Sequence, residues 1–106
     1  MVKEISVKEL KQMIDNGDEH QLIDVREPYE RDIATIGGKN LPLGQLLSKS
    51  DQVSRNKKVI IYCRSGARSA NAVQQLQAEF GSDNLFNLKG GILAWSDEVD
   101  PSIRKY

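Results

Sequence analysis

The segment KKVIIYCRSGARSA, Lys57–Ala70, joins a strongly apolar run to a run of helix-forming composition. Its four consecutive apolar residues, VIIY at 59–62, predict a central parallel strand that is buried on both faces. Cys63, the only cysteine in the chain, follows this strand directly, and a helix is predicted from Ser69 to Phe80. The segment therefore predicts a strand–loop–helix unit with a cysteine at the carboxyl end of its strand.

Short strands and helices alternate along the rest of the chain. Ser6 and Glu9 form a capping-box pattern, which predicts a helix that Gly17 ends. This alternation, with short connections, predicts an α/β fold in which helices cover both faces of a central parallel sheet. The strands are expected at 21–25, 57–63 and 84–88, with an extended piece at 40–41. The later helices are expected at 28–33, 69–80 and 92–99, with a helical turn at 43–49.

Composition limits the class of protein. A chain of 106 residues predicts a single domain, 1–106, with a core of its own. One cysteine excludes an internal disulfide, which favours the reducing cytoplasm, and no signal peptide is expected at the N-terminus. Lys+Arg and Asp+Glu number 15 each, so no overall field attracts nucleic acid, and no apolar run has the length of a membrane span.

The surroundings of Cys63 predict an anion-binding cup. Ligands of parallel α/β sheets bind beyond the carboxyl ends of the strands, where Cys63 stands. A loop that enters a helix offers unpaired amides, and Gly66 gives it conformational freedom. Arg64 and Arg68 add positive charge. Because cysteines in such sites have a pKa of about 3.5–7.5, we interpret Cys63 as a nucleophile; the alternative is an inert, buried cysteine.

The loop, Cys-x4-Arg followed by Ser and preceded by VIIY, resembles the active-site loop of rhodanese (sulfurtransferase) domains. Three other stretches resemble signatures of that family in the same order: LIDVREPYE at 22–30, NLPLGQL at 40–46 and NLKGGILAW at 87–95. The resemblance implies a three-layer rhodanese-like fold and a sulfane sulfur carried on Cys63 as a persulfide. It implies a substrate-binding cradle made by the amides of Arg64, Ser65, Gly66, Ala67, Arg68 and Ser69.

Other residues around the loop have expected roles. Asp24 and Arg26 could bind substrate, but an ion pair that braces the turn after their strand is favoured, and the resemblance supports that brace. Gly90-Gly91 is expected to let the backbone pass close to the Cys63 loop. No metal or cofactor is expected. The family usually has His-Ile-Pro-Gly-Ala where this chain has Thr35–Lys39, TIGGK. The intact nucleophile loop argues against a loss of activity, and Lys39 is expected to add charge nearby.

The expected reaction moves sulfur from a small anionic donor such as thiosulfate, or from a persulfide-bearing protein, to a nucleophilic acceptor. Residues 90–106, GGILAWSDEVDPSIRKY, resemble the end of rhodanese domains fused behind the adenylyltransferases of molybdopterin and thiamine biosynthesis. In those proteins the domain passes sulfur to a ubiquitin-like carrier, which implies a similar partner here. Neither a nucleic acid nor a membrane is expected as a partner.

Two other functions stay open. Phosphatases and arsenate reductases resembling this family have one more loop residue, Cys-x5-Arg, and a phosphatase also needs a general acid. No carboxylate lies near the loop in sequence, although a distant one could fold against it. A non-catalytic rhodanese module that only binds partners is the other alternative. The sulfurtransferase hypothesis requires an ionised, reachable Cys63 with main-chain donors around it.

Overall fold

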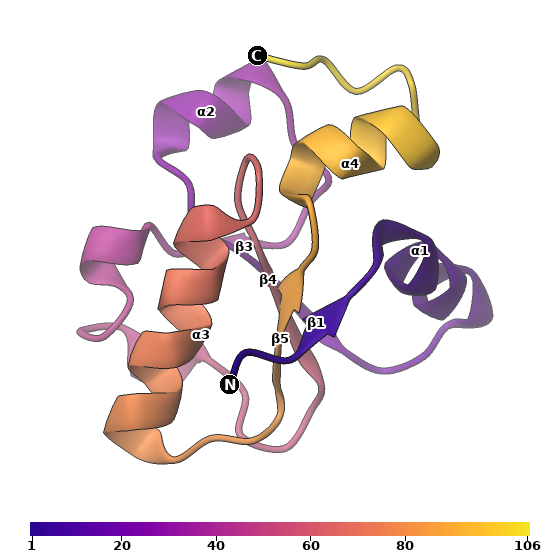
Figure 1. The fold of residues 1–106 in the computed structure, drawn as a ribbon. Helices are drawn as coiled ribbons and strands as arrows, with labels where there is room; N and C mark the ends of the chain where they lie inside the picture. The colour runs from indigo at the N-terminus through magenta and orange to yellow at the C-terminus, as the bar shows by residue number, and fades with distance from the viewer.

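The computed structural model describes residues 1–106 and has a five-stranded parallel sheet at its centre, in the order β1-β5-β4-β2-β3 (Figure 1). The strands are β1 (Glu4–Ile5), β2 (Gln21–Asp24), β3 (Lys39–Asn40), β4 (Val59–Tyr62) and β5 (Leu85–Leu88). The helices are α1 (Val7–Asn16), α2 (Pro28–Ile33), α3 (Ala67–Phe80) and α4 (Gly91–Glu98), with 3-10 turns η1 (Leu43–Gln45) and η2 (Ser50–Gln52). The predicted α/β fold is confirmed.

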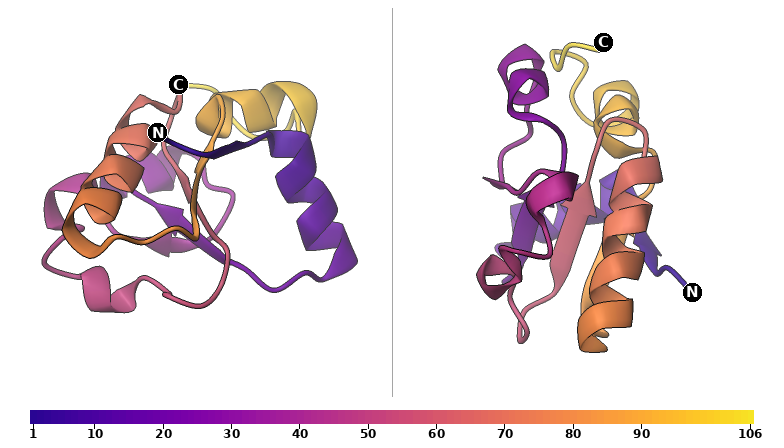
Figure 2. Two further views of the ribbon diagram at one scale, coloured as in Figure 1. Left: turned by 60° about the horizontal axis from the view of Figure 1, so that its bottom comes forward. Right: turned by 90° about the vertical axis from the view of Figure 1, so that its left-hand side faces the viewer.

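Helices cover both faces of the sheet, which creates two hydrophobic cores. Along β4, Val59 and Ile61 join the core beneath α3, while Ile60 and Tyr62 join the core beneath α1 and α4. Successive side chains of a strand point to opposite faces, so the unbroken apolar run of β4 fits a strand covered on both sides. Figure 2 shows α3 and α1 on opposite sides of the sheet.

The structure corrects three expectations about local structure. Strand β1 was not predicted, because its two residues are too few to carry a periodic pattern. The helical turn expected over 43–49 is shorter than predicted: it is the 3-10 turn η1, and the turns that follow it bring Leu46 into the core with no exposed surface. Helix α3 begins at Ala67, two residues early, because Gly66 turns the chain with a φ of 106°.

The predicted cap of α1 is confirmed. The Ser6 side chain accepts a hydrogen bond from the Glu9 amide, and the Glu9 carboxylate accepts one from the Ser6 amide. Gly17 ends the helix in the left-handed conformation. None of the four α-helices combines the length and the apolarity needed to cross a lipid bilayer.

Candidate active site

The loop between β4 and α3 directs hydrogen-bond donors at the sulfur of Cys63. The Sγ atom lies 3.1 Å from the amide nitrogen of Gly66, 3.4 Å from that of Ser69 and 3.3 Å from Ser69 Oγ. Gly66 and Ser69 are buried, while Arg64, Ser65 and Ala67 are exposed around them. Donors in this arrangement stabilise negative charge on an atom at the centre of the loop.

Helix α4 explains why the amides of this loop face inward. The amide of Ile92 donates to the carbonyl of Cys63 at 3.0 Å, and that of Leu93 donates to the carbonyl of Arg64 at 3.1 Å. Because trans peptide groups hold C=O and N–H on opposite sides, binding these carbonyls outside the loop turns the next amides toward its interior.

This close packing depends on Gly91. Its φ is 59°, and a Cβ atom there would lie 2.5 Å from the carbonyl oxygens of both Cys63 and Arg64. The expectation that Gly90-Gly91 lets the backbone approach the Cys63 loop is therefore confirmed.

An acidic side chain that sequence analysis did not single out pairs with the loop. Glu30 of α2 accepts two hydrogen bonds from Arg68, at 2.6 Å to Nη1 and 2.8 Å to Nη2. These bonds lower the pKa of Glu30 from 4.5 to about 2. Glu30 is the last residue of the LIDVREPYE signature, which was the only signal available in the sequence. The guanidinium of Arg68 is thus occupied by a partner within the protein.

This pair predicts a difference in acid stability. The folded-state pKa of Glu30 is lowered, so the stabilisation is present above pH 4.5 and is lost as the pH falls toward about 2. Over that window the wild type is expected to lose about 1–3 kcal/mol more unfolding free energy than Glu30→Gln. Urea unfolding at stepped pH measures the difference. Asp32→Asn, which removes an exposed carboxylate of the same helix, should behave like the wild type; equal slopes for all three proteins would contradict the prediction.

Asp24, the last residue of β2, and Arg26 form a buried ion pair. Arg26 donates to Asp24 through Nε at 2.9 Å and Nη2 at 2.8 Å, and neither side chain is exposed. Arg26 Nη2 also donates to the carbonyl of Ala34 at 2.8 Å, which ties the start of α2 to its end. The hydroxyl of Tyr62 lies 3.1 Å from Asp24 Oδ2, so the pair is in contact with β4 as well. The pair spans the turn that it was expected to brace.

The segment Thr35–Lys39 lies beside the Asp24–Arg26 ion pair and not beside the Cys63 loop. The carbonyl of Gly37 accepts a hydrogen bond from the Tyr62 hydroxyl at 2.8 Å. Lys39 is exposed on β3, one of the two edge strands of the sheet, and makes no hydrogen bond or ion pair with a loop residue.

The C-terminal segment crosses the carboxyl end of the sheet from α4 to α2 (Figures 1 and 2). The hydroxyl of Tyr106 donates to Glu30 Oε2 at 2.8 Å and accepts from Arg26 Nη1 at 2.8 Å. Its main-chain oxygen accepts a hydrogen bond from Arg64 Nε, and its ring centroid lies 5.3 Å from the Arg64 guanidinium. Tyr106 therefore links the Cys63 loop to α2, a connection that the sequence did not indicate.

The structure contradicts one requirement of the sulfurtransferase hypothesis. Cys63 was expected to be reachable, but only 1% of the residue is exposed. Its side chain belongs to the core cluster beneath α3, because it directly follows β4, a strand that is covered on both faces. The main-chain donors around the sulfur are present as expected. Access to Cys63 Sγ therefore requires a change from this closed arrangement.

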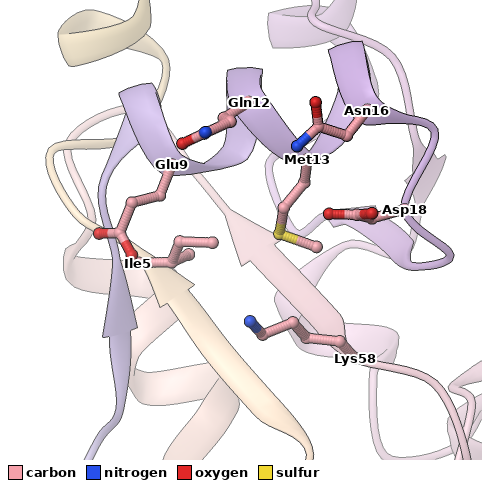
Figure 3. A pocket seen from close by; sticks show the side chains of 7 residues that line it. All are labelled: Ile5, Glu9, Gln12, Met13, Asn16, Asp18 and Lys58. Carbon is pink, nitrogen blue, oxygen red and sulfur yellow. The ribbon is translucent and has the colours of Figure 1, made fainter.

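The two cavities of the protein lie away from this loop. The cavity in Figure 3, of about 180 Å³, lies between α1, which contributes Glu9 and Met13, and the sheet side, which contributes Ile5 of β1 and Lys58. Lys58 precedes β4, whereas Cys63 follows it, so the two sites are at opposite ends of the strand. The second cavity lies between α4 and the C-terminal segment. Neither contains a residue of the Cys63 loop.

Comparison with known proteins agrees with this architecture. A family model described as "Rhodanese-like domain" matches residues 6–98. The chain is 35% identical over 97 residues to a protein named "Sulfurtransferase" from Allochromatium vinosum, covering 91% of this chain and 90% of that protein. It is 32% identical over 105 residues to "Probable adenylyltransferase/sulfurtransferase MoeZ" of Mycobacterium tuberculosis, covering 96% of this chain but only 26% of that protein.

Comparison of the fold with solved structures also finds rhodanese-like proteins. A crystal structure of a rhodanese-like domain protein from Staphylococcus aureus superposes with a TM-score of 0.82 at 27% identity, and 99% of each chain is covered. Its likeness spans the whole sheet and all four helices of this protein. By sequence and by fold, the chain belongs to the rhodanese-like domain family.

Proposed function

We propose that this protein is a sulfurtransferase that carries a sulfane sulfur on Cys63 as a persulfide. The observation that carries the proposal is the pair of main-chain amides that donate to Cys63 Sγ, those of Gly66 at 3.1 Å and Ser69 at 3.4 Å, with the Ser69 hydroxyl beside them at 3.3 Å. The amides of Arg64 and Ser65 have no acceptor within the protein and remain for an outer sulfur. Relatives named sulfurtransferase support the same reaction type.

The proposed reaction has two displacements. The Cys63 thiolate attacks the outer sulfur of the donor, an S–S bond forms, and the bond from that sulfur to the rest of the donor breaks. With thiosulfate, sulfite leaves with the bonding electrons; with a persulfide, a thiolate leaves. An acceptor such as cyanide or a thiol then attacks the outer sulfur, and the Cys63 thiolate returns. Atoms and electrons balance without another oxidant or reductant.

The two arginines take different roles in this proposal. Arg68 is held by Glu30 through two hydrogen bonds, so its guanidinium is compensated. Arg64 is exposed and uses only Nε within the protein, which leaves both Nη groups for the anionic part of a donor. We therefore assign donor binding to Arg64. The amides supply the remaining positive potential.

The state of Glu30 argues against a phosphatase. Glu30 is the carboxylate that folds against the loop, and its pKa of about 2 keeps it ionised at neutral pH. A general acid must hold a proton to give to its leaving group. An ionised carboxylate locked to Arg68 does not meet that need, whereas sulfur transfer needs no such proton.

For the acceptor, we propose a ubiquitin-like sulfur carrier of molybdopterin or thiamine biosynthesis. Support comes from the similarity to MoeZ, whose name joins an adenylyltransferase to a sulfurtransferase. This chain spans about a quarter of the length of MoeZ, so the proposed acceptor is inferred from similarity to that part of the protein alone. The reducing cytoplasm, where a lone Cys63 stays a free thiol, is the proposed compartment.

Tyr106 is the residue whose contacts we expect to loosen when a donor enters. Because Cys63 is 1% exposed, Sγ must become more accessible before it reacts. Tyr106 bonds to Arg64 on one side and to Glu30 on the other, across the end of the sheet where Cys63 lies. Breaking these contacts frees the exposed part of the loop from α2.

Tyr106→Ala is therefore expected to raise the rate at which iodoacetamide alkylates Cys63 by about threefold to tenfold, because alkylation follows the population of open molecules. The rate is measured by mass spectrometry at fixed pH. Tyr29→Ala is the matched control, since Tyr29 is 66% exposed on α2 and makes no side-chain hydrogen bond. Equal rates for the two variants would exclude Tyr106 as the closing contact.

Two assays on the wild type test the function. After incubation with thiosulfate, mass spectrometry should detect one added sulfur atom that cyanide removes, with formation of thiocyanate. In parallel, p-nitrophenyl phosphate should not be hydrolysed. Phosphate release without sulfur uptake would favour the phosphatase, and inactivity in both assays, with several persulfide donors, would favour a binding module.

A further inference from the structure

A chain of buried polar groups runs from Cys63 to the edge of the sheet. Ser69 Oγ lies 3.3 Å from Cys63 Sγ and 2.5 Å from Asn87 Oδ1. Asn87 Nδ2 donates to Glu4 Oε2 at 3.0 Å. Ser69 has no exposed surface and Asn87 is 2% exposed, whereas Glu4 is exposed. Two side chains, those of Ser69 and Asn87, thus connect the sulfur to the surface carboxylate of Glu4.

Strand pairing creates this connection. Glu4 of β1 and Asn87 of β5 are register partners in parallel strands, so their side chains lie side by side on one face of the sheet. That face is the one beneath α3, which carries Ser69.

The Ser69 hydroxyl has one proton and two acceptors within reach. A hydroxyl donates a single hydrogen bond, so Ser69 gives its proton either to Cys63 Sγ or to Asn87 Oδ1. Asn87 Oδ1 can only accept, so its 2.5 Å contact with Ser69 Oγ needs the Ser69 proton, whereas the 3.3 Å contact with Cys63 Sγ does not, because a thiol can itself donate to Ser69 Oγ. The proton therefore points toward Asn87, and the sulfur is left with the amides of Gly66 and Ser69 as its donors.

Glu4 determines which end of the Asn87 amide faces Ser69. A side-chain amide has a donor end and an acceptor end, whereas an ionised carboxylate only accepts. Nδ2 must face Glu4, and so Oδ1 must face Ser69. Turning the amide by half a rotation would set Oδ1 against the Glu4 carboxylate, where two acceptors repel, and would let Ser69 donate to the sulfur.

We propose that Glu4 is a positioning residue: through Asn87, it directs the Ser69 proton away from Cys63 Sγ and so restrains ionisation of the thiol. This inference rests on the proposed function in that Cys63 acts as a thiolate. Glu4 touches neither the sulfur nor a substrate, so its effect on sulfur transfer appears only through the fraction of Cys63 that is ionised.

Other charged groups around Cys63 stay in place when Glu4 is replaced. They are Arg64 of its own loop, Arg68 of α3, Glu30 of α2, and Asp24 and Arg26 at the end of β2. Helix α4 has no acidic residue in its first turn. Glu4 has no hydrogen bond or ion pair with any of them, so its replacement tests the connection through Asn87.

The test replaces the hydrogen-bond acceptor at position 4 with a donor. Glu4→Lys offers donors only, which turns Asn87 Oδ1 outward and Nδ2 toward Ser69. The Ser69 proton then goes to the sulfur, and the midpoint of thiolate formation, followed by ultraviolet absorbance, should fall by about one pH unit. Glu4→Gln, whose amide accepts either orientation, should give a smaller shift in the same direction. An unchanged midpoint in both variants would overturn the proposal.

A change of charge at position 4 also acts on the thiolate directly, and a double-mutant cycle separates the two effects. In a Ser69→Ala background the hydroxyl is absent, so Glu4→Lys should leave the midpoint almost unchanged. An equal shift in both backgrounds would mean that charge alone acts, which also overturns the proposal. Glu19→Lys, a distant exposed replacement, should have no effect.

The titration does not depend on sulfur transfer. If Cys63 ionises as expected in every variant but never takes up sulfur, the proposed function fails while the positioning role of Glu4 stands. If sulfur transfer occurs and the midpoints do not move, only the positioning role fails.

Discussion

Cys63→Ser is expected to lower sulfur transfer from thiosulfate to cyanide by roughly a thousandfold or more. A serine hydroxyl is not ionised at neutral pH and forms no persulfide, so both displacements lose their nucleophile. The side chain is nearly the same size and can accept the same hydrogen bonds from Gly66 and Ser69. The loss should therefore be chemical and not structural.

Thiocyanate formation measures the rate, and mass spectrometry should detect no added sulfur on the variant. The thermal unfolding midpoint serves as the control and should remain within a few degrees of the wild type. Turnover retained at more than about a tenth of the wild-type rate would remove Cys63 from the mechanism.

Gly91→Ala is expected to destabilise the protein by more than about 2 kcal/mol and to reduce sulfur transfer. A side chain at a φ of 59° is strained, which costs about 1–3 kcal/mol. The added Cβ would also lie 2.5 Å from two main-chain oxygens, those of Cys63 and Arg64, and neither can move without moving the loop. The hydrogen bonds from α4 that turn the loop amides inward would weaken as a result.

Gly81→Ala is the matched control for this effect. Gly81 has a similar φ of 64° at the end of α3, but nothing lies within 4 Å of a Cβ built there. Its replacement should cost only the strain, about 1 kcal/mol, with transfer unchanged. Urea unfolding gives both free energies. Equal losses for the two variants would mean that the contact between α4 and the loop is not tight.

The sequence predicted the features that depend on neighbours along the chain. The apolar run at 59–62 predicts burial on both faces wherever the strand lies, and the Ser6 capping box involves groups three residues apart. The donors on Cys63 Sγ come from Gly66 and Ser69, three and six residues further on. Contacts of this kind follow from local backbone geometry, so a short pattern indicates them.

The partners of the loop could not be predicted, because they come from other strands and helices. Glu30 reaches Arg68 across 38 residues, and Tyr106 reaches Arg64 across 42. Two-residue strands such as β1 have no periodicity, so the pairing of Glu4 with Asn87 was also invisible. The resemblance to the rhodanese family identified the nucleophile loop, but it did not predict these contacts.

By itself, the amino-acid sequence determined where the cysteine stands: after a doubly buried strand, before a helix, with amides close by in the chain. Only the tertiary structure decided the state of that site. Packing pairs Arg68 with Glu30, leaves Cys63 1% exposed and places Asn87 Oδ1 2.5 Å from Ser69 Oγ. Each of these outcomes depends on which distant groups share a small volume, and charge compensation and hydrogen-bond partners follow from distances in space, not along the chain.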